Sequence, residues 1–153
     1  GYCAFRPNFR GVGLSEGAHD EGRGETDDML AVLEEAKRRC GDLPVALAGF
    51  SFGGFVQTRV AKRLTEAGHP AQRLVLVGTA AGFVEGTRSY DTEAVPNDTI
   101  VIHGSADETV PLANVLKWAE PLELPVSVVP GADHFFHRRL HVIREIITRS
   151  WRH

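Results

Sequence analysis

The sequence predicts one α/β domain in which helices cover both faces of a mainly parallel sheet, a three-layer sandwich. Two observations carry this prediction. Short apolar runs of strand length alternate with longer segments of helical period, and the runs are apolar throughout, as strands buried on both faces are. The chain of 153 residues is 42% hydrophobic and 24% charged, which fits a globular domain with its own core. The expected strands are 45–50, 73–78, 99–104 and 126–129.

Ahead of these runs, the sequence YCAFR at residues 2–6 predicts a short strand that leads into a glycine-rich loop. A helix is expected from Glu25 to Cys40, because apolar residues recur along one face at spacings of three and four. Acidic residues stand at its start and basic residues at its end, which suits the helix dipole, and Gly41 can end it. Its apolar positions are Met29, Val32, Leu33, Ala36 and Cys40.

The apolar run 45–50 is followed by a second expected helix, from about Gly53 to Ala67, with Gly68 at its end. Its inward stripe consists of Val56, Val60 and Leu64. Beyond the strand 73–78, a loop is expected as far as Asp98. The remaining strands alternate with helices at 111–120 and 138–151. The last helix has an apolar side made of Leu140, Ile143, Ile147 and Trp151.

Composition and charge argue against several classes of partner. A net charge of −3 gives no reason to expect nucleic acid or an anionic membrane. No apolar run approaches the ~20 residues that a membrane-spanning helix needs, and no signal peptide is recognisable. We therefore expect a cytoplasmic protein and make no prediction of its oligomeric state. Cys3 and Cys40 are expected to be buried reduced thiols rather than a disulfide or a metal site.

The chain opens at Gly1 in the middle of a strand-like pattern, and its only methionine is Met29. We expect a single domain, 1–153, that is incomplete at its N-terminus.

The segment GFSFG at 49–53 matches the pattern GxSxG, with a strand before it and a helix after it. Glycines permit a bend too tight for side chains, and such a bend would lift the hydroxyl of Ser51 above the carboxyl edge of the sheet. A bare match to this pattern is common, but the strand, the bend and the helix are in register here. The sequence therefore favours Ser51 as a nucleophile over a structural turn serine.

A serine hydroxyl needs a base to remove its proton, and the base needs a carboxylate to orient it. Asp107 follows the strand 99–104 and His134 follows the strand 126–129, so both come after Ser51, beyond later strands. Because the carboxyl ends of parallel strands meet at one edge of a sheet, we expect these three side chains to lie together.

Other residues compete for the two supporting roles. His137 is the main rival to His134, which is favoured because the turn PGAD ends just before it. Glu108 and Asp133 are rivals to Asp107, but Asp133 is more plausible as a loop-stabilising residue. His103 stands at a strand end before the acid, and we expect it to lie beside the site residues rather than among them.

No cofactor and no metal are expected. The glycines at 11, 13 and 17 have the spacing GxGxxxG, one residue off the dinucleotide fingerprint, and no helix is expected to start at the last of them. The sequence also lacks paired cysteines or histidines at zinc spacings.

Taken together, these segments resemble the α/β-hydrolase superfamily, in particular small compact bacterial hydrolases. The resemblance covers nearly the whole chain. It implies a Ser-His-Asp hydrolase that cleaves a small ester or related acyl bond through an acyl-enzyme, with the backbone N–H of Phe52 as an oxyanion donor. Members of this family carry a second oxyanion donor ahead of the first strand of this chain, so the chain alone is expected to be weakly active. The segments that carry the resemblance are NFRGVGLSEG, GFSFGG, IHGSADETVP and PGADHFFH.

Only about twenty residues separate the strands 73–78 and 99–104, too few for a large helical lid. We therefore expect an open site for a small-molecule acyl substrate, with Phe50 and Phe135 as an apolar wall. Two alternatives stay open: acyl transfer by the same three residues, and a non-catalytic α/β module that serves as a binding or scaffold protein.

Overall fold

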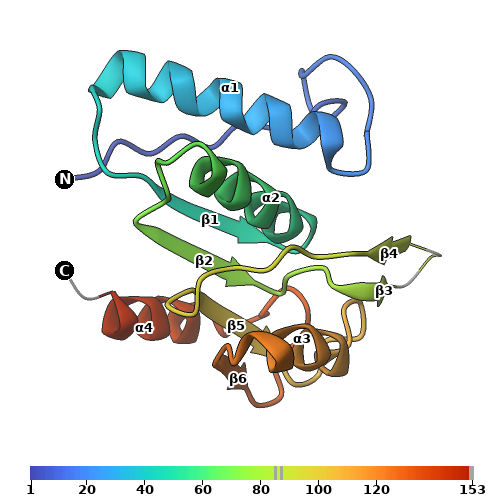
Figure 1. The fold of residues 1–153 in the computed structure, drawn as a ribbon. Coiled ribbons are helices and arrows are strands. Elements are labelled where there is room, and N and C mark those ends of the chain that lie inside the picture. Colours follow the sequence, from blue (N-terminus) through green and yellow to red (C-terminus); the bar gives the residue numbers. More distant parts are fainter. Residues whose placement is uncertain (85, 87, 152–153) are drawn as a thin grey trace. The chain divides into compact units, whose positions relative to one another are not determined.

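The computed structural model describes residues 1–84, 86 and 88–151 (Figure 1). It divides into two compact units, Gly1–Val45 and Ala46–His153, and each is described by itself. The predicted single domain that is incomplete at its N-terminus stays a prediction. The predicted loop before Asp98 includes Glu85 and Thr87, which lie outside the described residues, as do Arg152 and His153.

The larger unit is built on a four-stranded parallel sheet, and its four strands confirm the predicted ones. The strand order is β1-β2-β5-β6, so the parallel strands lie side by side in the order in which they occur along the chain. The register pairs Phe50 with Val77 and Val77 with Ile102, which brings the carboxyl ends of β1, β2 and β5 into one row. The strands are β1 (Ala46–Phe50), β2 (Arg73–Val77), β5 (Ile100–Gly104) and β6 (Val126–Val129).

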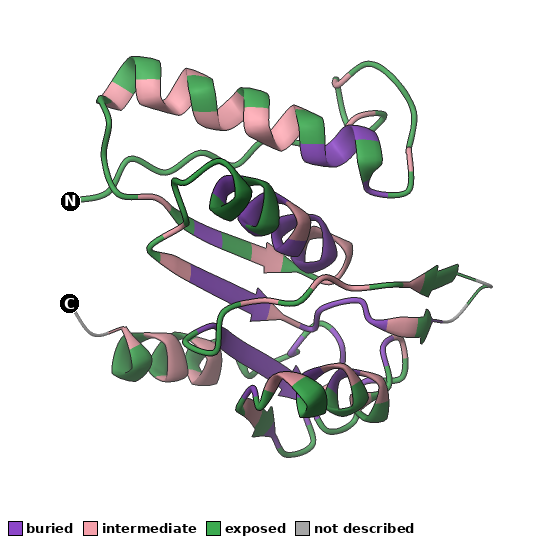
Figure 2. Cartoon of the chain, in the orientation of Figure 1, coloured by how far each residue is buried: buried purple, intermediate pink, exposed green. Residues whose placement is uncertain are grey.

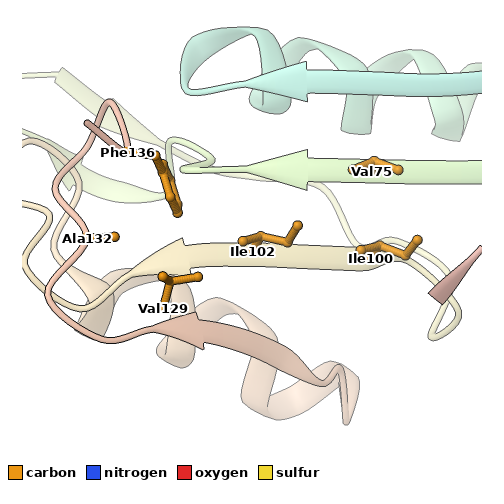
Figure 3. Close-up of a cluster of buried hydrophobic side chains, with 6 residues drawn as sticks. All are labelled: Val75, Ile100, Ile102, Val129, Ala132 and Phe136. Carbon is orange, nitrogen blue, oxygen red and sulfur yellow. The ribbon is translucent and has the colours of Figure 1, made fainter. Parts of the chain in front are cut away.

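Helices cover both faces of this sheet, as predicted. The helix α4 (Leu140–Ser150) packs against one face, where Ile143 and Ile147 meet a core of buried side chains. Figure 3 shows this core, drawn from β2, β5, β6 and the loop after β6. Its six buried members are Val75, Ile100, Ile102, Val129, Ala132 and Phe136.

The opposite face is covered by α2 (Phe52–Glu66), which contacts β1 and β2, and by α3 (Leu112–Ala119), which contacts β5. A short 3-10 helix, η1 (Glu120–Leu122), extends α3. Side chains alternate along a strand, so the neighbours of the α4-facing residues point to this second face. Figure 2 shows β2 and β5 buried almost throughout. The predicted stripe on α2, Val56, Val60 and Leu64, is buried.

Three details of this unit differ from the sequence prediction. Only Leu47 of β1 is buried, because β1 is an edge strand with a single neighbour, β2. The predicted loop contains an antiparallel pair, β3 (Gly82–Val84) and β4 (Arg88–Tyr90), whose three-residue strands are too short to produce a periodic signal. Leu140 is exposed because it is the first residue of α4, before the inward-facing turns of the helix.

The smaller unit consists mainly of α1 (Arg23–Cys40), which confirms the predicted helix and starts two residues earlier. The buried carboxylate of Glu25 reaches back to accept hydrogen bonds from the backbone N–H groups of Gly22 and Asp20, at 2.9 and 2.7 Å. At the other end, the N–H of Gly41 donates to the carbonyl of Lys37, so the predicted terminating glycine is confirmed.

The predicted strand at residues 2–6 is wrong. No described strand pairs with this segment, and strand-forming side chains alone make no strand without a neighbour for their backbone hydrogen bonds. The glycine-rich loop that follows is held to α1 by a two-pronged ion pair, in which Nε and Nη2 of Arg10 donate to Asp28 at 2.7 and 2.8 Å.

The expectation of reduced thiols is also wrong, because Cys3 and Cys40 form a disulfide with their Cα atoms 6.7 Å apart. Neither residue is fully buried. Two cysteines 37 positions apart carry no sequence signal for pairing, which depends on where the segment before the loop runs beside α1.

None of the described helices is both long and apolar enough to cross a membrane.

The disulfide generates a stability prediction. Cys40→Ser should lower the free energy of unfolding by about 2–4 kcal/mol, because the cross-link restricts the unfolded chain over a long loop. Urea unfolding of the oxidised protein and the variant measures the difference. The double variant Cys3→Ser/Cys40→Ser should match the single one, and reductant should shift only the unsubstituted protein. Alkylation of both cysteines in the native, unreduced protein would contradict the assignment.

Candidate active site

The chain bends at Ser51, between the end of β1 and the start of α2, where the sequence predicted it. Ser51 has φ 54° and ψ −121°, a backbone conformation that a side chain strongly disfavours. Hydrogen bonds hold it there: the N–H of Ser51 donates to the carbonyl of Val77 at 3.0 Å, and its own carbonyl accepts from Ala80 at 3.1 Å. The serine is therefore fixed on a strained bend above the sheet.

Glycines next to the bend allow this close approach. A Cβ on Gly49 would run into the backbone carbonyl of Gly53, and a Cβ on Gly54 would collide with the side chain of Thr79. The first turn of α2 thus packs directly against β1 and the segment after β2. This explains physically why the GxSxG pattern needs glycine at its first position.

The structure brings Ser51, His134 and Asp107 into one hydrogen-bonded chain. His134 Nε2 lies 3.0 Å from the Ser51 hydroxyl, and His134 Nδ1 lies 2.7 Å from Oδ2 of Asp107. Because the carboxylate can only accept, Nδ1 carries the imidazole proton and the lone pair of Nε2 faces the serine. The imidazole is 5% exposed, the Asp107 side chain is fully buried, and Ser51 is half-buried.

Asp107 is fixed by its own loop. Its Oδ1 accepts the backbone N–H groups of Thr109 and Val110, at 3.0 and 2.8 Å, which turns Oδ2 toward His134. The chain from β5 to α3 therefore folds around this carboxylate.

The rival residues form a separate pair. His137 donates both its backbone N–H and a ring N–H to Asp133, and this hydrogen bonding holds the pKa of Asp133 below its usual value. The His137 side chain is 73% exposed. The structure thus places His134, and not His137, against Ser51, and it places Asp107, and not Asp133, against His134.

His103 lies beside this group, as expected, and is completely buried. Its Nε2 is 2.8 Å from the carbonyl of Val110 and 3.3 Å from Oδ2 of Asp107. Burial lowers the pKa of His103, because the charged imidazolium is poorly solvated there.

Two exposed aromatic rings flank His134. The Phe50 and Phe135 centroids lie 4.9 and 5.1 Å from that of the imidazole, and 5.8 Å from each other. Phe52 is turned away: its ring packs near Phe55 and Tyr90, while its backbone nitrogen opens the first turn of α2.

One contributor to the site was missed by sequence reasoning. Gly78, at the end of β2, has φ +55°, and a Cβ there would lie 3.2 Å from the Phe50 ring and 3.5 Å from His134 Cε1. In the sequence, Gly78 is simply the residue that ends an apolar run, and nothing in that run indicates that an imidazole will lie next to it.

In the described part of the chain, no three or more His, Cys, Asp or Glu side chains are grouped so as to hold a metal ion. An apolar hollow between α3 and β6, bordered by Leu116, Leu124 and Val126 among others, contains none of the predicted site residues.

The chain is similar to the structure of an α/β serine hydrolase homologue from Coxiella burnetii, with 36% identity, a TM-score of 0.77, and coverage of 95% of this chain and 67% of that one. It is also similar to XC6422 from Xanthomonas campestris, an α/β serine hydrolase without lid, with 35% identity, a TM-score of 0.75, and coverage of 94% and 62%.

Among curated proteins, a lysophosphatidylserine lipase, ABHD12 of Gallus gallus, is 38% identical over 90 residues, which cover 59% of this chain and 23% of the lipase. The chain spans 23% to 59% of the length of three curated relatives that it matches. The model of the thioesterase domain family matches residues 16–146. With its parallel sheet, its relatives and this match over most of its length, the chain belongs to the thioesterase domain family of the α/β-hydrolase superfamily.

Proposed function

We propose that this hydrolase is a serine hydrolase that cleaves a small ester or thioester through an acyl-enzyme, with Ser51 as its nucleophile. One observation carries the proposal: the continuous chain of hydrogen bonds from Ser51 through His134 to Asp107, at 3.0 and 2.7 Å. A scaffold protein has no use for a strained serine that faces an unprotonated imidazole nitrogen. The family match supports including thioesters among the substrates.

The chemistry would follow from these positions. Ser51 Oγ attacks the carbonyl carbon of the substrate while His134 Nε2 takes its proton, and Asp107 stabilises the resulting imidazolium. The proton then passes to the leaving alcohol or thiol. Water attacks the acyl-enzyme in the same way and releases the acid.

The negative oxygen of the intermediate would be met by the backbone N–H of Phe52. This nitrogen opens α2, where the positive end of the helix dipole favours an anion. Its contribution is therefore both a hydrogen bond and a favourable field.

The acyl group would lie against Phe50 and Phe135. These rings are 42% and 61% exposed, and water-exposed aromatic surface gains most from covering an apolar group. The similarity to a lysophosphatidylserine lipase supports an apolar acyl chain. The described residues between β2 and β5 form no helix and contain the short strands β3 and β4, which supports an open site.

The central prediction concerns covalent labelling. A fluorophosphonate should modify Ser51, and Ser51→Ala and His134→Ala should abolish the adduct. Hydrolysis of p-nitrophenyl acetate should fall by at least about a thousandfold in both variants, as for other triads. Intact-mass and peptide mass spectrometry locate the adduct.

Matched controls come from the neighbouring exposed pair. Asp107→Asn should cost about 10⁴ in rate by favouring the wrong imidazole tautomer. Asp133→Asn and His137→Ala should leave the rate close to that of the unsubstituted protein. Undiminished hydrolysis by Ser51→Ala would contradict Ser51 as the nucleophile, whereas neither labelling nor hydrolysis in the folded, unsubstituted protein would support a non-catalytic module.

A second prediction concerns the aromatic wall. Phe135→Ala should lower kcat/KM for p-nitrophenyl butyrate about three- to tenfold, and less for the acetate, because only the longer acyl chain reaches much of the ring. Phe83 is similarly exposed but lies on β3, so Phe83→Ala is the matched control. Equal losses for both esters would contradict an acyl-binding wall.

A third prediction concerns Gly78. Gly78→Ala should lower kcat about tenfold or more, because the new methyl group would lie 3.2 Å from the Phe50 ring and press that ring against the neighbouring His134, and small displacements of reacting groups are costly. Gly68→Ala is the control: Gly68 has φ +81° and no neighbour within 4 Å, so it tests backbone strain alone. The idea fails if the two variants retain equal activity.

A further inference from the structure

We propose that His103 is a positioning residue for Asp107: its Nε2–H donates to the Val110 carbonyl, which clamps the loop that carries the carboxylate, and it lies close to the Oδ2 atom that His134 contacts. This inference rests on the proposed function and deepens it, since it names a residue outside the three reacting side chains that the reaction depends on.

The contacts of His103 bracket the turn 107–110. From the end of β5, its Nε2 is 2.8 Å from the carbonyl oxygen of Val110 and 3.3 Å from Oδ2 of Asp107. The N–H of Val110 in turn donates to Oδ1 of Asp107 at 2.8 Å. One ring nitrogen therefore touches both ends of the turn and ties it to the most buried strand of the sheet, β5.

The protonation state follows from these partners. A carbonyl and a carboxylate oxygen can only accept, so Nε2 must carry the proton. Burial lowers the pKa of His103, so the neutral form is the one present near pH 7. The charged or titratable groups that act on this ring are Asp107, from the loop after β5, and His134, from the loop after β6. The helix that contacts β5 on this face of the sheet is α3, and its buried residues, Val115 and Ala119, are uncharged.

Packing alone does not account for an imidazole at this position. The other ring nitrogen, Nδ1, is buried and has no hydrogen-bond partner among the described residues. A buried, unpaired ring nitrogen opposes folding, and an aliphatic side chain would fill the space without one. What the imidazole adds is the Nε2–H donor, and among the described residues the acceptors recorded near it are the Val110 carbonyl and Oδ2 of Asp107, both in the Asp107 turn.

The donor has an electrostatic consequence for His134. The Nε2–H group lies 3.3 Å from Oδ2, and its partial positive charge offsets part of the carboxylate charge, so Asp107 attracts the proton of the imidazolium less strongly. Loss of His103 should therefore both slow the reaction and move the acid limb of its pH profile upward.

The test compares His103→Leu with His103→Gln in the hydrolysis of p-nitrophenyl acetate across pH. Leucine removes the donor, and glutamine places an amide N–H close to where Nε2 stood. His103→Leu should lower kcat about 10- to 100-fold with KM little changed, the size of effect typical for outer hydrogen-bond partners of functional side chains. Its acid limb should move to higher pH, and His103→Gln should recover most of both.

Two measurements separate positioning from simple destabilisation. Val101→Ala, a cavity on the same strand and the same face, should lower the melting temperature without moving the pH profile. In ¹⁵N-histidine NMR spectra of the resting protein, His103 should carry its proton on Nε2, and the Nδ1–H signal of His134 should shift in His103→Leu.

The outcomes are distinct. Wild-type kcat and an unmoved profile in His103→Leu overturn the inference, as does equal impairment of the leucine and glutamine variants with an unmoved profile. Absence of Ser51-dependent hydrolysis in the unsubstituted protein overturns the proposed function. The NMR comparison still decides on the clamp in that case, because an unchanged His134 signal would show that His103 does not position Asp107.

Discussion

A carboxylate that is taken out of water has to be met by hydrogen-bond donors, and Asp107 is met on every side. Two backbone N–H groups donate to Oδ1, and two imidazoles approach Oδ2. These groups come from three segments: the turn after β5, the end of β5 itself, and the loop after β6. The burial of one charge thus fixes the relative positions of three segments, because any loosening would leave that charge unpaired.

The sheet supplies the platform for this arrangement. Parallel pairing with the observed register puts the ends of β1, β2 and β5 in one row, so the loops that follow them meet. Strain at Ser51 is tolerated because the bend is tied to β2 by the Val77 carbonyl and supported by the packing of α2. Gly78 follows β2 in this row, and a side chain there would press on the Phe50 ring that packs beside His134.

Much of this could be predicted from the sequence, and the failures have physical causes. The buried strands and amphipathic helices were predicted correctly because their sequence signal is periodic and local. The bend at Ser51 was predicted correctly because backbone geometry requires glycines beside it. The strand predicted at residues 2–6 was wrong because a strand depends on a neighbouring strand, which residue propensity does not reveal. The Cys3–Cys40 disulfide was not predicted because cysteine pairing depends on which segments the fold brings together. Gly78 and the clamp of His103 were missed because their partners are distant in the sequence.

The loop after β6 contains a natural comparison that shows what burial contributes. Two Asp–His pairs of the same chemical type lie next to each other: His134 with Asp107, and His137 with Asp133. In the exposed pair, water screens the charges and competes for both partners, so the interaction does little beyond stabilising its own turn. In the buried pair, the carboxylate has no water to turn to, and the imidazole is held in a single tautomer with one nitrogen aimed at Ser51. The two pairs contain the same residue types, so residue type does not distinguish the candidate site from a surface ion pair. The difference is that the buried pair lies at the edge of the sheet, where neighbouring segments exclude water.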